Sequence, residues 1–186
     1  MVWLSSLWLP IVLSAIAAHI ASSILHMLIG HHAGDRGRLP QEDALLEALR
    51  AQHAAPDDYM APHLYGAGAL KDPEIAAKRR EGPIVVMTLM PGGQLRMARS
   101  LTQWFIYLLV VFGLAAYVAS RTLPSGAAYL AVFRVVGTVA FMGLALGYPP
   151  SSIWWQQRWS TTLKYMIDGL IYALLGAGLF GWLWPR

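Results

Sequence analysis

The chain of 186 residues is 56% hydrophobic and 13% charged, about half the charged share of a typical soluble domain. It contains no cysteine, which excludes thiolate metal sites, cysteine-ligated iron–sulfur clusters and cysteine nucleophiles. Many of the basic residues behind its net charge of +4 lie beside apolar segments, which favours contact with anionic lipids over contact with nucleic acid.

Four apolar segments are long enough to cross a bilayer, which takes about 20 residues. The first covers residues 1–30, carries no Asp, Glu, Lys or Arg, and has Pro10 near its start, where a proline can kink a helix. The other three lie within residues 99–186, at about 101–119, 127–148 and 161–184, and short turns join them. The sequence therefore predicts an all-α integral membrane protein, built as an antiparallel bundle of four transmembrane helices.

Residues 31–98 form one large polar loop that holds every acidic residue except Asp168. Three leucines at helical spacing predict a short amphipathic helix at 41–52. Asp72, followed by a proline, predicts the N-cap of a second short helix. The apolar run at 84–90 is too short to span, and is expected to be a strand or a segment on the membrane surface.

Lysines and arginines near the ends of the spans predict the orientation of a multi-pass protein. They are more numerous on the side of the large loop, so we place residues 31–98 in the cytoplasm and both termini outside. The excess of arginine over lysine and the abundant alanine suit a GC-rich bacterial genome, which favours the bacterial inner membrane. The basic residues that we expect to contact anionic headgroups are Lys78, Arg79, Arg80, Arg96, Arg99 and Arg158.

Several polar residues lie inside the predicted spans, where a charged side chain costs about 2.5–3.5 kcal/mol on insertion scales. On the first span, four of them recur at helical spacing and share one face. Depth along the bundle places His26 opposite Asp168, whereas Arg134 lies farther out; we also expect Lys164, one turn before Asp168, to supply it with a positive charge. The full set comprises Ser22, Ser23, Arg134, Lys164 and Asp168, with His19 and His26.

Neutral imidazoles and carboxylates are competent ligands for Zn, Fe or Cu, so a transition-metal site is one interpretation of these residues. The other is that they form hydrogen bonds across helices and only stabilise the bundle. Haem is not expected, because two histidines seven residues apart lie about 10 Å apart on one helix and the later spans contain none. The candidate metal ligands are His19, His26, His31, His32 and Asp35, with His53 or His63 as further candidates.

The string from His26 to His32 resembles one histidine box of the membrane desaturases and hydroxylases. Those enzymes carry several such boxes, and the second to fourth spans of this chain contain no histidine, so we reject that family. No phosphate-binding loop, nucleophile elbow or zinc-protease motif occurs either.

Small residues recur along the last two spans, where they allow close approach of helix backbones. They could serve the bundle itself, a second copy of the chain, or another membrane protein. The leading hypothesis is therefore a non-enzymatic accessory, assembly or scaffold subunit of a membrane complex. The alternative is a metal- or proton-handling membrane protein, similar to a small oxidoreductase, that uses the histidine face of the first span. The small residues are Gly143, Gly147, Gly169, Ala173, Ala177 and Gly181.

Overall fold

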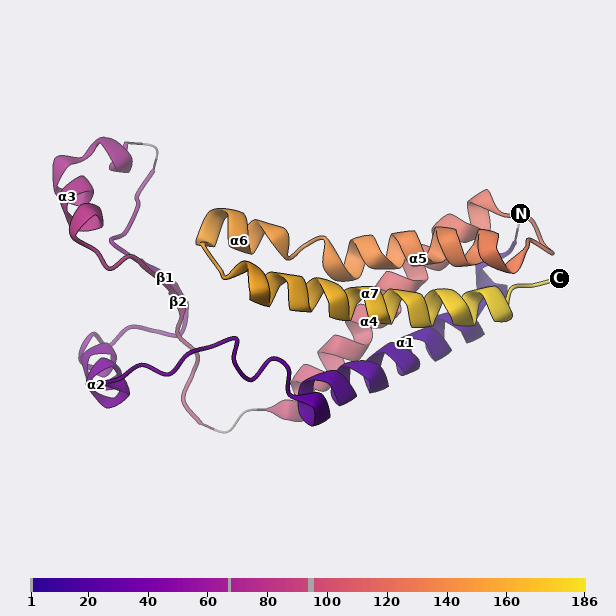
Figure 1. Ribbon diagram of the computed structural model, residues 1–186, viewed down its shortest axis with the longest axis horizontal. Helices are drawn as coiled ribbons and strands as arrows, with labels where there is room; N and C mark the ends of the chain where they lie inside the picture. Colours follow the sequence, from indigo (N-terminus) through magenta and orange to yellow (C-terminus); the bar gives the residue numbers. More distant parts are fainter. Residues whose placement is uncertain (1, 67, 94–95) are drawn as a thin grey trace. The chain divides into compact units, whose positions relative to one another are not determined.

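The computed structural model describes residues 2–66, 68–93 and 96–186 and is mostly helical (Figure 1). The chain forms two compact units, one made of Met1–Arg36 and Arg96–Arg186 and the other of Gly37–Leu95. Within the described ranges, four helical segments are long and apolar enough to cross a membrane, in agreement with the four predicted spans. They are Leu4–Ile29, Met97–Thr122, Tyr129–Trp155 and Trp159–Trp182.

The first of these segments changes its helical geometry twice. A 3₁₀ turn, η1 (Leu4–Leu7), leads into the α-helix α1 (Trp8–Ser23), which continues as a π-helix, η2 (Ile24–Ile29). Gly30 then adopts a left-handed conformation with φ of 65°, which ends the helix in the way that glycine favours. The chain therefore turns sharply directly after η2.

The remaining helices of this unit are α4 (Met97–Thr122), α5 (Tyr129–Ala145), α6 (Pro149–Trp155) and α7 (Trp159–Trp182). Helix α1 packs against α4 and α7, and α5 packs against the same two helices. Figure 1 shows both termini at one end of this bundle, where backbone hydrogen bonds join Val2 to Ser120 and Gly126 to Pro185. The predicted third span ended at Pro149, but this residue instead begins α6, because proline is well tolerated in the first turn of a helix.

The small residues of α7 lie inside the bundle. Ala173 and Ala177 are buried, and a Cβ added at Gly169 would lie 2.6 Å from the backbone oxygen of Leu144 at the end of α5. The two helices can approach this closely only because Gly169 has no side chain. Helix α5, rather than a helix of another protein, therefore covers this ridge.

The second unit contains two short helices and a small sheet. Helices α2 (Glu42–Ala51) and α3 (Pro73–Glu81) lie where the sequence predicts them, and the Asp72 carboxylate caps α3 by accepting the Glu74 amide at 2.9 Å. Strands β1 (Asp58–Ala61) and β2 (Val85–Thr88) pair antiparallel. Strand β2 confirms the strand alternative for residues 84–90. Strand β1 was not predicted, because a four-residue strand is too short to show a clear alternation of polar and apolar residues.

Candidate functional site

Residues 31–36, which follow the first helix, pack against α7 instead of joining the second unit. The Lys164 ammonium on α7 donates hydrogen bonds to the His31 carbonyl at 2.6 Å and to the Asp35 carboxylate at 2.7 Å. The Arg158 guanidinium donates two more, at 2.6 and 2.8 Å, to backbone carbonyls of the same segment. These bonds hold the segment against the beginning of α7.

Three imidazoles converge on the carboxylate of Asp168, which is only 3% exposed. The Nε2 atom of His31 lies 3.1 Å from Oδ1, and the Nε2 atom of His32 lies 2.8 Å from Oδ2. The Nε2 atom of His26 lies 3.8 Å from Oδ2, so His26 faces Asp168 as the sequence predicts. We refer to His26, His31, His32 and Asp168 as the histidine–aspartate cluster.

In His26 and His32, the partner of the second ring nitrogen fixes where the proton lies. The Nδ1 atom of His26 lies 3.0 Å from the Ser22 carbonyl, which can only accept, so this nitrogen carries the proton. The Nδ1 atom of His32 donates in the same way to the Asp35 carboxylate. In the neutral rings, both Nε2 atoms therefore direct lone pairs toward the same oxygen of Asp168. Such an arrangement is stable only with a proton or a metal cation between these atoms.

Charges and hydrogen bonds beside the cluster shift the pKa values of Asp35 and His32. The Lys164 ammonium, and after it the His32 ring, lower the pKa of Asp35 to about 2. Burial lowers the pKa of His32, but its hydrogen bonds to Asp168 and Asp35 outweigh this effect and leave the pKa raised. The His32 ring also stacks with the rings of Tyr165 and His26, at centroid distances of 4.5 and 4.6 Å. The site therefore favours a positive charge at His32.

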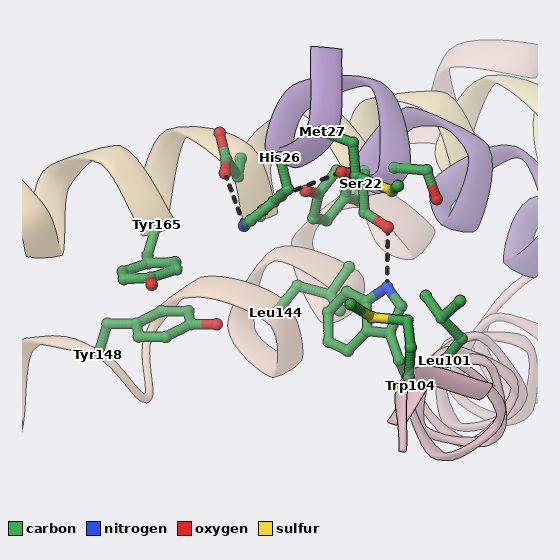
Figure 2. A pocket seen from close by; sticks show the side chains of 13 residues that line it. Ser22, His26, Met27, Leu101, Trp104, Leu144, Tyr148 and Tyr165 are labelled. Carbon is green, nitrogen blue, oxygen red and sulfur yellow. Dashed lines mark hydrogen bonds and ion pairs between the residues drawn. The ribbon is translucent and has the colours of Figure 1, made fainter. Parts of the chain in front are cut away.

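A cleft of about 360 Å³ opens beside the cluster (Figure 2). His26 and Asp168 line its polar end, and Leu101, Trp104 and Leu144 line its apolar part. The indole of Trp104 donates a hydrogen bond of 2.9 Å to the Ser22 hydroxyl, which connects α4 to α1 at the edge of the cleft. A small molecule in the cleft would therefore lie next to the imidazole nitrogens and carboxylate oxygens that converge in the cluster.

Other predicted residues lie outside the cluster. His19 packs edge-on against Phe105, at a centroid distance of 5.7 Å, and its buried Nδ1 atom has no hydrogen-bond partner in the described part of the chain. Ser23 donates to the His19 carbonyl at 3.0 Å, and Arg134 lies on the exposed surface of α5. His53 and His63 belong to the second unit.

Two details of the cluster differ from the expectation. Lys164 bonds Asp35 and not Asp168, because residues 31–36 fold back far enough to reach it. Tyr148 and Tyr165, whose rings stack at a centroid distance of 4.9 Å, were not predicted to line the site. Tyr165 lies three residues before Asp168 on the same helix, and that spacing is the sequence signal that would have found it.

The residues of the cluster fit a transition-metal ion. His26, His32 and Asp168 each offer one ligand atom, and these atoms lie within 4.8 Å of one another. Metal–ligand bonds of about 2.0–2.2 Å place two ligands of one ion roughly 3–4 Å apart, so small side-chain movements would complete the site. His31 would then donate to the other oxygen of Asp168 and orient the carboxylate.

Comparison of the chain with protein-family models, with curated proteins and with solved structures finds no match in any of the three. The function is therefore argued from the chemistry of the histidine–aspartate cluster and of the cleft beside it.

Proposed function

We propose that this chain is a multi-pass protein of the bacterial inner membrane that binds one transition-metal ion through His26, His32 and Asp168. One observation carries the proposal. The Nδ1 atoms of both histidines are held by oxygen acceptors, while both Nε2 atoms face the same carboxylate oxygen. Metal-binding histidines have this pattern, because the acceptor at one nitrogen fixes the tautomer and orients the other nitrogen toward the metal.

The ligand set indicates the kind of metal and its role. Two imidazoles and one carboxylate suit zinc or iron(II) better than calcium or magnesium, which prefer oxygen ligands. Three protein ligands leave a coordination position open, as in sites where a metal acts on water or on a substrate. The cleft is lined by two of the three proposed ligands, His26 and Asp168, so a molecule bound in it would lie beside the metal.

The four long apolar helices support the membrane assignment. The cytoplasmic side is the one that carries residues 37–95, and both termini face outside. The cluster then lies near the cytoplasmic surface, at the end of the first span and the beginning of the last. The packing also removes one argument for an accessory subunit, because α5 covers the small-residue ridge of α7, which could have served either the bundle or a partner.

Metal analysis of the full-length protein tests the proposal. The protein is purified in mild detergent without chelators, offered zinc or iron(II), and analysed by inductively coupled plasma mass spectrometry. We expect a single bound ion per chain, which His26→Gln and Asp168→Asn abolish. The His26 side chain is 40% exposed, so its replacement leaves the fold intact.

His53→Gln, which changes a histidine of the second unit, is the matched control and should retain the metal. Circular dichroism verifies that each variant is folded. A folded wild-type protein that binds neither metal, or metal content unaffected by His26→Gln, would overturn the proposal. It would leave the cluster as a protonated hydrogen-bond network.

A further inference from the structure

The apolar part of the cleft is open at one side. Met27, Met97 and Leu101 line it, and these side chains are 69%, 55% and 37% exposed. The opening lies between two of the helices that are long and apolar enough to cross a membrane, so its natural occupant is apolar. The cleft volume falls within the roughly 300–1,000 Å³ that is usual for small-molecule sites.

The opposite end of the cleft is polar. His26 and Asp168 line it together with Tyr148 and Tyr165. Figure 2 shows the rings of Tyr148 and Tyr165 side by side at this end, whereas Leu101 and Trp104 lie at the other. A ligand that fits both ends carries a polar group and an apolar chain on one molecule.

The charges around the polar end indicate what kind of polar group it accepts. Within the described residues no Lys or Arg side chain lines the cleft, the Lys164 ammonium is paired with Asp35 at 2.7 Å, and imidazoles already contact both oxygens of Asp168. An ionised headgroup would lose its hydration here without meeting an unpaired side-chain charge of opposite sign, which is unfavourable away from water. An uncharged oxygen, such as that of an alcohol, an ester or an amide, needs only a hydrogen bond or a metal ion.

We propose that the cleft binds a membrane amphiphile with an uncharged oxygen headgroup, and that this oxygen occupies the open position of the metal. The second part rests on the proposed function. The first part does not, because it depends on the shape and the polarity of the cleft alone. The apolar chain of the amphiphile would leave between Met27 and Leu101 and continue into the bilayer.

Photolabelling of the full-length protein in lipid nanodiscs tests this inference. The probe is a long-chain alcohol with a photoreactive diazirine near the hydroxyl end of its chain, and the control probe is an alkane of equal length with the same group. We expect the alcohol to label peptides of the cleft severalfold more than the alkane does. Leu101→Trp fills the cleft and should lower this labelling to the level of the alkane.

Leu114→Trp is the matched control, because Leu114 is an exposed leucine of the same helix outside the cleft lining. It should leave the labelling unchanged. Met27→Trp is a second cleft-filling variant at a more exposed position, which keeps the test decisive if Leu101→Trp fails to fold. Equal labelling by alcohol and alkane, or labelling that neither tryptophan reduces, would overturn the inference.

Metal content is measured on the same samples, so the two proposals fail separately. Bound metal without selective labelling overturns the amphiphile site alone, and selective labelling without metal overturns the metal site alone. A cobalt-loaded sample tests the contact between them. Its visible absorption should change when the long-chain alcohol is added and stay constant with the alkane, and no change with either would overturn the contact.

Discussion

Replacement of Asp35 by asparagine should weaken metal binding although Asp35 is not a ligand. The Asp35 carboxylate accepts a hydrogen bond from the His32 Nδ1 atom with one oxygen and from the Lys164 ammonium, at 2.7 Å, with the other. Asparagine keeps the size of the side chain but turns one acceptor into a donor. Since an ammonium cannot accept a hydrogen bond, the amide oxygen should remain on Lys164 and the amide nitrogen should face His32.

The His32 ring can adapt to this change only by moving its proton. Its Nδ1 atom would become the acceptor and its Nε2 atom would carry the proton, which blocks the lone pair that the metal needs. Loss of such an outer partner typically costs about 10–100-fold in metal affinity, or about 1.4–2.7 kcal/mol. The Asp35 side chain is only 7% exposed, so solvent screening should not reduce this effect much.

Competition for zinc against a chromogenic chelator at neutral pH measures the dissociation constant of each variant. We expect the constant to rise about 10–100-fold in Asp35→Asn. It should stay unchanged in Asp43→Asn, which makes the same replacement at an exposed position of α2. A constant in Asp35→Asn equal to that of the wild type would refute the argument from the tautomer of His32.

Four further predictions concern the fold and its surroundings. Gly169→Ala should lower the free energy of unfolding by about 1–3 kcal/mol, because its Cβ would clash with Leu144, whereas Gly113→Ala, with no atom within 4 Å of its Cβ, should not lower the melting temperature. The Tyr65 hydroxyl, and after it the Glu74 amide, lower the pKa of Asp72; its stabilisation of α3 is then complete above pH 3.8, the ordinary value, and is lost as the pH falls through the lowered pKa. Hydrogen exchange of the α3 amides, measured as a function of pH, should show this loss of stability, and Asp72→Asn should remove the pH dependence. A reporter fused to Arg186 should be active outside the cytoplasm, and activity inside would contradict the orientation. Co-purification of anionic lipids should fall when the basic group is neutralised, and unchanged lipid content would contradict its role; this group comprises Lys78, Arg79, Arg80, Arg96, Arg99 and Arg158.

The apolar helices could be predicted because length and composition alone decide whether a segment can cross a bilayer. It could also be predicted that His26 and Asp168 face each other. The first and last spans were predicted to run antiparallel, which puts these two residues at similar depth. The observed distance of 3.8 Å between His26 Nε2 and Asp168 Oδ2 confirms this prediction. Both conclusions need only a helical rise per residue and a topology.

The position of His31 and His32 could not be predicted in the same way. They follow the first span, and the sequence does not show that the chain turns back toward α7 after Gly30. The turn depends on bonds to Lys164 and Arg158, which lie more than a hundred residues away in the sequence. These are tertiary contacts, and the local pattern of polar and apolar residues does not indicate them.

The placement of His19 beside His26 also relied on a regular helix. Residues seven apart share a face only while the helix keeps about 3.6 residues per turn. The π-helix η2 begins at Ile24 and includes His26, and its wider turns rotate that side chain relative to His19. The structure accordingly brings His26 to Asp168 and leaves His19 against Phe105.

This irregular backbone is itself an argument for a functional site. A π-helix is less favourable than an α-helix, and such segments occur frequently at functional sites. A bundle held together only by packing would gain nothing from η2, which the turn at Gly30 follows directly. Together they let His26, His31 and His32, all from one short stretch of chain, approach a single carboxylate. The π-helix thus lies where the ligand atoms converge, which favours a site for a metal over hydrogen bonds that merely stabilise the bundle.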